Sequence, residues 1–261
     1  MKFYDQLASD YDAFIDWEER LKREDPFFQH IFRECLATSI LDLGCGSGGH
    51  SLYWGGMGMN VVGVDSAAAM IQHAEALAEQ SELDIEFHTL PVTNFAQRIQ
   101  QQFDSVVCVG NTLPHLLTAE DVLKCFHETI ASLKPSGAAI FHCLNYQRIL
   151  DVKKRDMPVK SRVIDGKEYI FCRYYEFGSP HLTFHFVTAV KEDGEWRSHS
   201  HQLMHHPWRR DELVNLAKQA GFTQIMQYGG YDFSEFVDTE SNDLILVCET
   251  GETEYEEGDY K

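Results

Sequence analysis

The sequence predicts an α/β fold: a mostly parallel sheet with helices on both faces, and a small antiparallel sheet inserted toward the end of the chain. Strand-like apolar segments alternate with helical segments over residues 40–143, which is the pattern of a parallel sheet built from βα units. A glycine-rich turn follows the first of these strands. From about residue 147 side chains alternate with period two, which favours antiparallel strands. At 261 residues the chain can bury one substantial core.

The first 24 residues combine aromatic with acidic side chains and have two interpretations. Apolar residues recur at helical spacing, which predicts either an amphipathic helix packed on the core or a flap that closes over a site: Tyr4, Leu7, Tyr11, Phe14 and Ile15. A second helix is predicted to begin at Asp25-Pro26. Its expected buried face consists of Phe27, Phe28, Ile31, Phe32 and Leu36.

The first strand and the turn after it are predicted at Ile40–Leu43 and Gly44–Gly48, followed by a helix. Glycines let the backbone pass close to a ligand, and the free N–H groups of the next helix attract an anion. A second strand, Asn60–Asp65, ends in an acid, and Ser66 is expected to cap the helix after it.

The remaining elements follow in order. Strands are expected at 85–88, 103–109 and 138–143, with a helix from Thr118 through Leu133. The antiparallel insert is expected to have strands Tyr169–Phe177, Leu182–Val190 and Trp196–His205; a helix Arg209–Ala220 and the strands Phe222–Tyr228 and Leu244–Glu249 complete the sheet. The predicted divisions are a flap (1–24), a core (25–146 and 206–250), a substrate-lid insert (147–205) and an acidic tail (251–261).

Composition narrows the class of protein. The net charge of −19 disfavours nucleic acid as a partner and suits a protein that works in concentrated salt. The sequence has no run of roughly 18 apolar residues for a membrane span, and no apolar secretion signal near Met1, so we expect a cytoplasmic protein. The seven cysteines are expected to be reduced, and no set of metal ligands is recognised. The sequence leaves open a monomer or a homo-oligomer.

The glycine turn and Asp65 form the strongest functional pattern. Gly44-x-Gly46-x-x-Gly49 satisfies the dinucleotide fingerprint, and Asp65 lies about twenty residues on, where a ribose-binding acid belongs. The stretch Asp42–Gly48 resembles motif I of class I S-adenosylmethionine-dependent methyltransferases, and residues 103–111 and 133–138 resemble later motifs of that family. The resemblance implies a Rossmann-like, seven-stranded methyltransferase sheet and S-adenosyl-L-methionine as cofactor.

A narrower resemblance concerns the acceptor. Phe3-Tyr4-Asp5, Trp17-Glu18-x-Arg20 and Gly110-Asn111-x-x-x-His115-Leu116 are similar to the glycine/sarcosine N-methyltransferases of betaine synthesis. This implies N-methylation of glycine or sarcosine, and of dimethylglycine as a further acceptor, toward the osmolyte betaine. Two alternatives stay open: a methyltransferase for another small amine or carboxylic acid, and a non-catalytic regulator that binds S-adenosylmethionine.

The resemblance also implies cofactor-binding residues. Asp65 is expected to accept hydrogen bonds from the ribose. The backbone at Gly44 and Gly46 would receive the methionine end, and Arg20 would reach its carboxylate from the flap. Met70 and Leu90 are expected beside adenine. The remaining cofactor residues implied are Tyr11, Trp17, Ser66 and Val109.

For the acceptor, the resemblance implies that Asn111 faces the methyl group and the substrate. An amino-acid carboxylate needs an arginine, and Leu144 stands where the animal glycine methyltransferases carry one. The insert offers Arg162 and Arg173, and we predict Arg173 together with Tyr175, since they share one face of a strand. His115 and His142 could accept the amine proton or shape the pocket, although the chemistry requires no strong general base.

Overall fold

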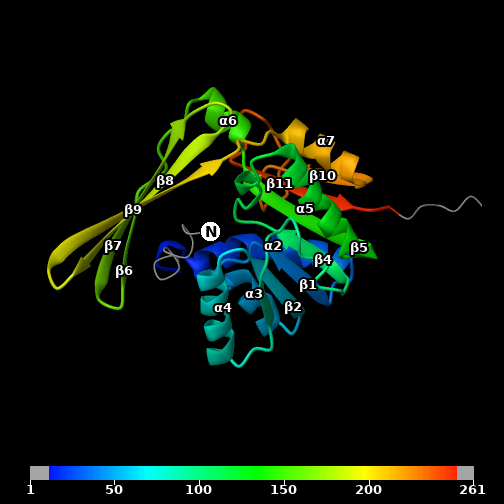
Figure 1. The fold of residues 1–261 in the computed structure, drawn as a ribbon, viewed down its shortest axis with the longest axis horizontal. Helices are drawn as coiled ribbons and strands as arrows, with labels where there is room; N and C mark the ends of the chain where they lie inside the picture. Colours follow the sequence, from blue (N-terminus) through cyan, green and yellow to red (C-terminus); the bar gives the residue numbers. More distant parts are fainter. Residues whose placement is uncertain (1–11, 252–261) are drawn as a thin grey trace, which may run out of the picture.

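The computed structural model describes residues 12–251, so the predicted roles of Tyr11 and of the acidic tail lie outside the described residues. Figure 1 shows a main α/β body and a long antiparallel sheet that extends from it. The helices are α2 (Trp17–Glu34), α3 (Gly49–Gly56), α4 (Ala68–Gln80), the 3-10 turn η1 (Leu113–His115), α5 (Ala119–Ala131), α6 (Tyr146–Asp151) and α7 (Arg210–Ala220).

Seven strands form the main sheet in the order β10-β11-β5-β4-β1-β2-β3. They are β1 (Ser39–Leu43), β2 (Asn60–Asp65), β3 (Glu86–Thr89), β4 (Phe103–Cys108), β5 (Leu133–Leu144), β10 (Gln224–Tyr228) and β11 (Asp243–Glu249). The pairs from β5 to β3 are parallel, whereas β11 pairs antiparallel with both β5 and β10. This confirms the predicted Rossmann-like, seven-stranded fold, whose ligands bind where the carboxyl ends of the parallel strands meet.

Two apolar layers hold helices on opposite faces of this sheet. One contains α2 and α3 with Phe28, Trp54 and Ile140, and the other contains α5 and α7 with Phe126 and Leu213. These side chains are almost completely buried, so each helix is fixed by the apolar stripe that the sequence displays.

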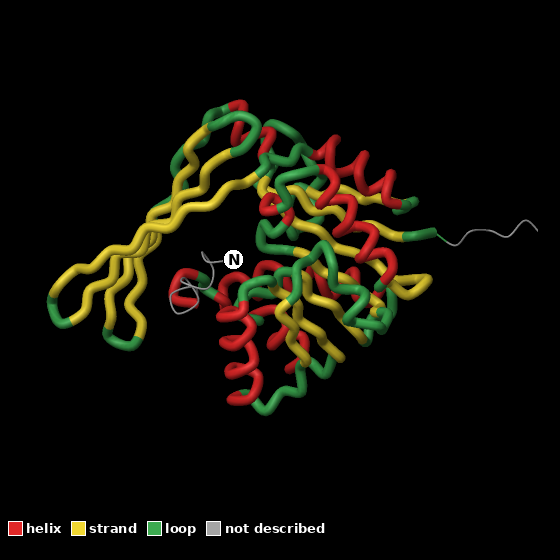
Figure 2. Tube along the Cα trace, viewed as in Figure 1, coloured by secondary structure: helices red, strands yellow, loops and turns green. Residues whose placement is uncertain are grey.

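The predicted antiparallel insert is confirmed as a separate sheet of four strands, β6 (Lys160–Ile164), β7 (Lys167–Phe177), β8 (Leu182–Glu192) and β9 (Glu195–His205). Figure 2 shows these strands projecting from the main body beside the first described residues. Phe14 packs edge-on against Phe171 and Phe186, at centroid distances of 5.5 and 5.1 Å. Phe14 of the predicted flap therefore packs on the insert.

The structure corrects three local expectations. The second helix does not begin at Asp25-Pro26: α2 begins at Trp17, and its N-cap Asp16 accepts a hydrogen bond from the Glu19 N–H at 3.2 Å. Pro26 is exposed inside this helix, so water can satisfy the carbonyl that loses its N–H partner. The predicted boundary at residues 24 and 25 thus falls within one helix. Leu36 lies beyond the helix and is exposed, not buried.

Ser66 does not cap α4 either. The N-cap residue is Ala67, which has no side-chain hydrogen bond to offer; the Asp65 carboxylate accepts from the Ala67 N–H at 2.8 Å instead. The cysteines agree with the prediction, since all seven are free thiols. Within residues 12–251, no helix combines the length and apolarity that crossing a membrane requires.

Candidate active site

A cavity of about 170 Å³ lies at the carboxyl ends of β1, β2 and β4. Seven of the predicted cofactor residues line it: Trp17, Arg20, Gly44, Gly46, Asp65, Ser66 and Val109. Asp42, His50 and residues 91–93 also contribute. We call it the cofactor cavity.

The glycine turn forms one wall because its backbone takes conformations that other residues resist. Gly44, Gly46 and Gly48 have φ values of 71°, 58° and 82°. A Cβ on Gly44 would lie 2.6 Å from Thr112 Oγ1, and one on Gly49 would lie 2.3 Å from the Trp17 ring. Glycine is therefore required both for the turn and for the close approach of its neighbours.

Asp65 is fixed at the end of β2 by two backbone donors. The Gly46 N–H reaches Oδ2 at 3.0 Å and the Ala67 N–H reaches Oδ1 at 2.8 Å. Burial raises the pKa of Asp65, and these hydrogen bonds counteract it. Each carboxylate oxygen retains acceptor capacity on the cavity side, as a pair of ribose hydroxyls would need.

Asp42 is a second buried acid on the cofactor cavity. Ser51 Oγ donates to its Oδ2 at 2.6 Å, and burial raises the pKa of Asp42 to about 7. A cation bound nearby would favour the ionised form.

Asp12, at the start of the described chain, contacts the elements that surround this cavity. Its Oδ1 accepts from Trp17 Nε1 at 3.1 Å and from Ser47 Oγ at 2.6 Å, and its Oδ2 lies 2.8 Å from His73 Nε2. The Arg20 guanidinium lies over the Trp17 ring at 5.1 Å. Asp12 thus ties the entry to α2 to both the glycine turn and α4.

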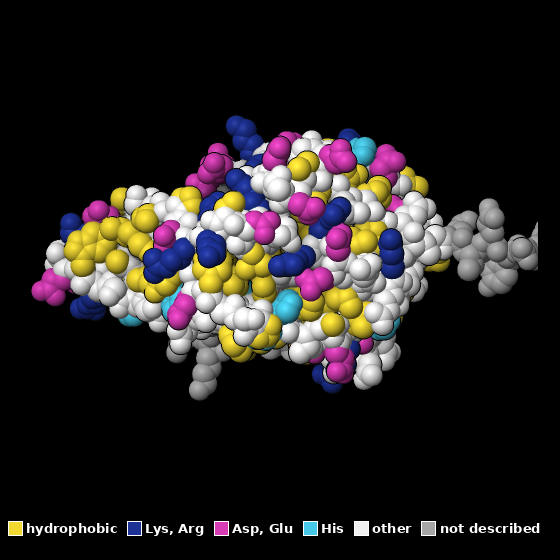
Figure 3. Space-filling view, turned by 90° about the horizontal axis from the view of Figure 1, so that it is seen from above, with side chains coloured by type: hydrophobic (Ala, Val, Ile, Leu, Met, Phe, Trp, Pro, Cys, Tyr) yellow, Lys and Arg dark blue, Asp and Glu magenta, His cyan; other side chains and the backbone are white. Residues whose placement is uncertain are grey.

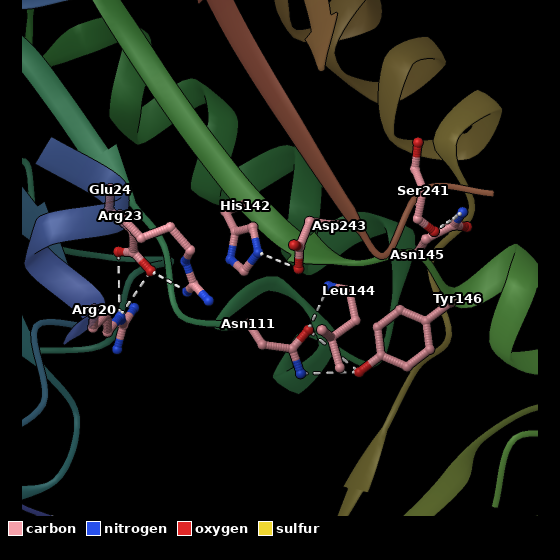
Figure 4. Close-up of polar contacts among 10 residues, drawn as sticks. All are labelled: Arg20, Arg23, Glu24, Asn111, His142, Leu144, Asn145, Tyr146, Ser241 and Asp243. Atoms are coloured by element: carbon pink, nitrogen blue, oxygen red, sulfur yellow. Dashed lines mark hydrogen bonds and ion pairs between the residues drawn. The ribbon is translucent and has the colours of Figure 1, made fainter. Parts of the chain in front are cut away.

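Sequence reasoning missed a buried charged cluster centred on Glu24. Figure 4 shows Arg20 and Arg23 converging on its carboxylate, at 3.1 and 2.9 Å. His50 Nε2 lies 2.9 Å from the other carboxylate oxygen. Burial opposes ionisation of Glu24, but the His50 hydrogen bond and the Arg20 charge prevail and lower its pKa to about 2. Burial lowers the pKa of His50 to about 4, so a neutral ring donates to an ionised carboxylate.

Two predicted cofactor residues do not line the cofactor cavity. Met70, in the first turn of α4, is completely buried and packs against Ala67. Leu90 packs against the main core, and the three residues after it, Pro91, Val92 and Thr93, line the cavity instead. β3 ends at Thr89, and the segment after it reaches the cavity from Pro91 on.

A second cavity, of about 520 Å³, adjoins the first, and Arg20, Gly110 and His115 line both. We call it the acceptor cavity. All four residues predicted for the acceptor line it: Asn111, His142, Arg173 and Tyr175. The insert, the described flap residues and the carboxyl ends of β4 and β5 in the main sheet therefore surround one cavity.

Arg173 enters this cavity from β7. Its guanidinium lies 4.5 Å from the centroid of Phe14, and its buried Nε has no hydrogen-bond partner among residues 12–251. Desolvation lowers the pKa of Arg173, although the group stays charged. Arg162, the other candidate, donates instead to the carbonyls of Ala13 and Ile15, at 3.3 and 2.7 Å.

Both the oxygen and the nitrogen of the Asn111 side-chain amide form hydrogen bonds within the protein (Figure 4). Its Oδ1 accepts from the Leu144 N–H at 3.0 Å, and its Nδ2 donates to Tyr146 Oη at 3.0 Å. Tyr146 Oη lies 3.2 Å from Tyr175 Oη. Asn111 also has a φ of 71°, so the backbone after β4 is held in a left-handed turn.

His142 has an orienting carboxylate that the sequence did not indicate. Its Nε2 lies 3.1 Å from Asp243 Oδ1, and Asp243 comes from the neighbouring strand β11 (Figure 4). A carboxylate only accepts, so Nε2 carries the hydrogen and Nδ1 of a neutral ring presents a lone pair. The buried Nδ1 has no partner in the described part of the chain.

Comparison with known proteins agrees with this geometry. Residues 40–137 match the family model described as a methyltransferase domain. The fold resembles a crystal structure of an S-adenosylmethionine-dependent methyltransferase from Clostridium acetobutylicum, with a TM-score of 0.77 over 96% of this chain and 98% of that chain, at 17% identity. The chain is a class I S-adenosylmethionine-dependent methyltransferase, and S-adenosylmethionine is its cofactor.

Its sequence relatives include two glycine/sarcosine N-methyltransferases. The protein from Parasynechococcus marenigrum is 28% identical over 241 residues, covering 88% of this chain and 79% of the relative. The protein from Aphanothece halophytica is 27% identical over 245 residues, covering 94% and 88%.

Proposed function

We propose that this enzyme transfers methyl groups to the nitrogen of a small amino acid of the glycine and sarcosine type, toward betaine. The observation that carries the proposal is the desolvated Arg173 on the wall of the acceptor cavity. A buried guanidinium with an unpaired N–H suits a carboxylate, which would restore the missing hydrogen bond and balance the charge. The names of the two relatives support the same acceptor class.

The amine end of such an acceptor belongs near the junction of the two cavities, beside Gly110 and His115. S-adenosylmethionine, when bound, supplies the methyl group. The chain supplies a water-poor space in which acceptor and cofactor meet in line, and this positioning accounts for most of the acceleration. We assign His142 Nδ1 as the group that accepts a hydrogen bond, and finally the proton, from the acceptor amine, with Asp243 holding the ring.

The cofactor residues have corresponding proposed roles. Asp65 receives the ribose hydroxyls, the Gly44–Gly46 backbone receives the methionine end, and Arg20 lies within reach of its carboxylate. Adenine then lies against Ser66 and the 91–93 segment, in place of the predicted Leu90.

One assay tests the acceptor. Release of S-adenosylhomocysteine is measured with glycine, sarcosine and dimethylglycine in parallel, at low and high potassium. Turnover with glycine or sarcosine is expected. Turnover with methylamine or propionate alone would favour another small amine or acid, and cofactor binding without product from any acceptor would indicate a non-catalytic regulator.

A further inference from the structure

Three buried nitrogen atoms on the acceptor cavity lack a hydrogen-bond partner within residues 12–251. They are Arg173 Nε, His142 Nδ1 and His205 Nε2. The proposed function uses the first two. His205 ends β9, has 2% of its surface exposed, and belongs to a histidine-rich stretch that the sequence did not link to the site. An unpaired polar atom in so buried a ring calls for a ligand.

Hydrogen bonds around Tyr146 connect Asn111 to Nδ1 of His205. The Leu144 N–H occupies Asn111 Oδ1, so the Asn111 amide is oriented with Nδ2 donating to Tyr146 Oη. Tyr146 Oη lies 3.3 Å from His205 Nδ1. Tyr146 Oη also lies 3.4 Å from Asn111 Oδ1, which the Leu144 N–H already occupies, and 3.2 Å from Tyr175 Oη. We take Tyr175 as the donor toward Tyr146, which leaves Nδ1 of His205 to accept the Tyr146 proton. Figure 4 shows three of these residues, Leu144, Asn111 and Tyr146.

The surroundings keep His205 neutral and fix its ring plane. Burial lowers its pKa well below the ordinary value, and the nearby His115 acts in the same direction. The ring stacks on Phe184 at 5.2 Å with an interplanar angle of 12°. A neutral imidazole that accepts at Nδ1 must carry its hydrogen on Nε2. The atom without a partner is therefore a donor.

We propose that His205 Nε2–H donates a hydrogen bond to the carboxylate of the acceptor, beside the charge supplied by Arg173. The inference rests on the proposed function, because it assumes that the carboxylate binds in this cavity. Register supports it: the cross-strand sets Arg173–Phe186–His201 and Phe177–Leu182–His205 lie four positions apart along the strands, so Arg173 and His205 point to the same side of the sheet. A neutral second donor adds specificity, since an acceptor lacking the carboxylate leaves this N–H unpaired.

The test compares acceptors with and without a carboxylate. His205→Phe keeps the ring and removes the donor; we expect the KM for glycine or sarcosine to rise about tenfold, the scale of one lost hydrogen bond to a charged group. The KM for methylamine, which has no oxygen to accept this hydrogen bond, and the affinity for S-adenosylmethionine should not change. His199→Phe, at an exposed position on β9, is the matched control. Tyr146→Phe, which removes the proton that fixes the tautomer, should reproduce part of the effect.

An unchanged KM for glycine in folded His205→Phe, or an equal rise for methylamine, would overturn the inference. A second measurement distinguishes failure of the His205 inference from failure of the proposed function. In protein carrying ¹⁵N-labelled histidine, His205 should show a protonated Nε2 whose resonance shifts when acetate is added, even if neither glycine nor sarcosine is methylated. A non-protonated Nε2, or no shift with acetate, would refute the assignment.

Discussion

Arg173→Ala removes a desolvated guanidinium from the acceptor cavity, so the acceptor carboxylate loses its charged partner. We expect the KM for the amino acid to rise about 10- to 100-fold, corresponding to roughly 1.5–3 kcal/mol for a hydrogen bond to a charged group. The dissociation constant for S-adenosylmethionine, measured by calorimetry, should stay the same. Arg197→Ala, on the exposed part of the same sheet, serves as control. An unchanged KM in the Arg173 variant would remove this residue from the acceptor site.

Glu24 and His50 both contribute stability that is lost as the pH falls, because the fold lowers the pKa of each. The native pKa of Glu24 is about 2 against 4.5, so its stabilising effect is present above about pH 4.5 and is lost as the pH falls toward 2. The native pKa of His50 is about 4 against 6.5, and its contribution is lost as the pH falls from 6.5 through 4. Asp42 acts in the opposite sense over the same range, because its pKa is raised to about 7, so the contribution of Glu24 and His50 is read from the difference in Tm between the wild type and a Glu24 variant.

Glu24→Gln tests this cluster directly. Loss of the carboxylate removes the buried ion pair between Glu24 and Arg20, so we expect a stability loss of order 3 kcal/mol at pH 7 and a difference in Tm from the wild type that shrinks toward pH 4. Glu120→Gln, which breaks an exposed pair with Lys124, should change neither quantity measurably. A Glu24→Gln profile parallel to that of the wild type would contradict the assignment of the pH dependence to this cluster.

The same residues show what could be predicted from the sequence. The glycine turn and Asp65 were predictable because their spacing is local and each residue type has a distinct backbone or ligand requirement. Glu24 and Asp243 were not, since their histidine partners lie 26 and 101 residues away in the chain. A charged residue on a helix resembles any solvated residue until the fold buries it.

At the scale of elements, Arg162 on β6 joins the insert to the described flap residues. It donates to the carbonyls of Ala13 and Ile15 and lies 3.7 Å from Asp16, the N-cap of α2. Arg162→Ala should let this segment open more often. We expect faster amide hydrogen exchange at residues 12–16 and a several-fold higher KM for both substrates, with Tm lowered by only a few degrees. Arg155→Ala, at an exposed position outside this contact, should leave the exchange rates, both KM values and the Tm unchanged. A similar effect of Arg155→Ala would show that the contact made by Arg162 is not the cause.

The types and order of the elements followed from periodicity, whereas their ends and mutual placement did not. The strands of the insert show period two and were predicted. The contact of Phe14 with Phe171 joins a residue that precedes α2 to strand β7 of the insert, and no local pattern encodes it. Pro26 misled the prediction of a helix start because proline favours a first turn, yet an exposed proline is tolerated within a helix that packs well on its other face.

For the whole molecule, charge sets the response to salt. Asp and Glu number 41 against 22 Lys and Arg, and Figure 3 shows acidic side chains scattered over the visible face rather than gathered in one patch. Mutual repulsion should therefore destabilise the folded chain at low salt. Raising KCl toward 1 M shortens the screening length from about 10 Å at 0.1 M to about 3 Å, which removes most of that repulsion.

We accordingly expect the Tm to rise with KCl and to approach a plateau below about 1 M, because screening saturates. Sucrose at matched osmolality separates this from a general solute effect, since it leaves charges unscreened. Neutralising the exposed acids Glu79, Glu82 and Asp84 together, as Glu79→Gln, Glu82→Gln and Asp84→Asn, should raise the Tm at low salt and reduce its increase with KCl. A Tm that falls between 0.05 and 1 M KCl would refute adaptation to concentrated salt, because screened repulsion can only stabilise so acidic a chain.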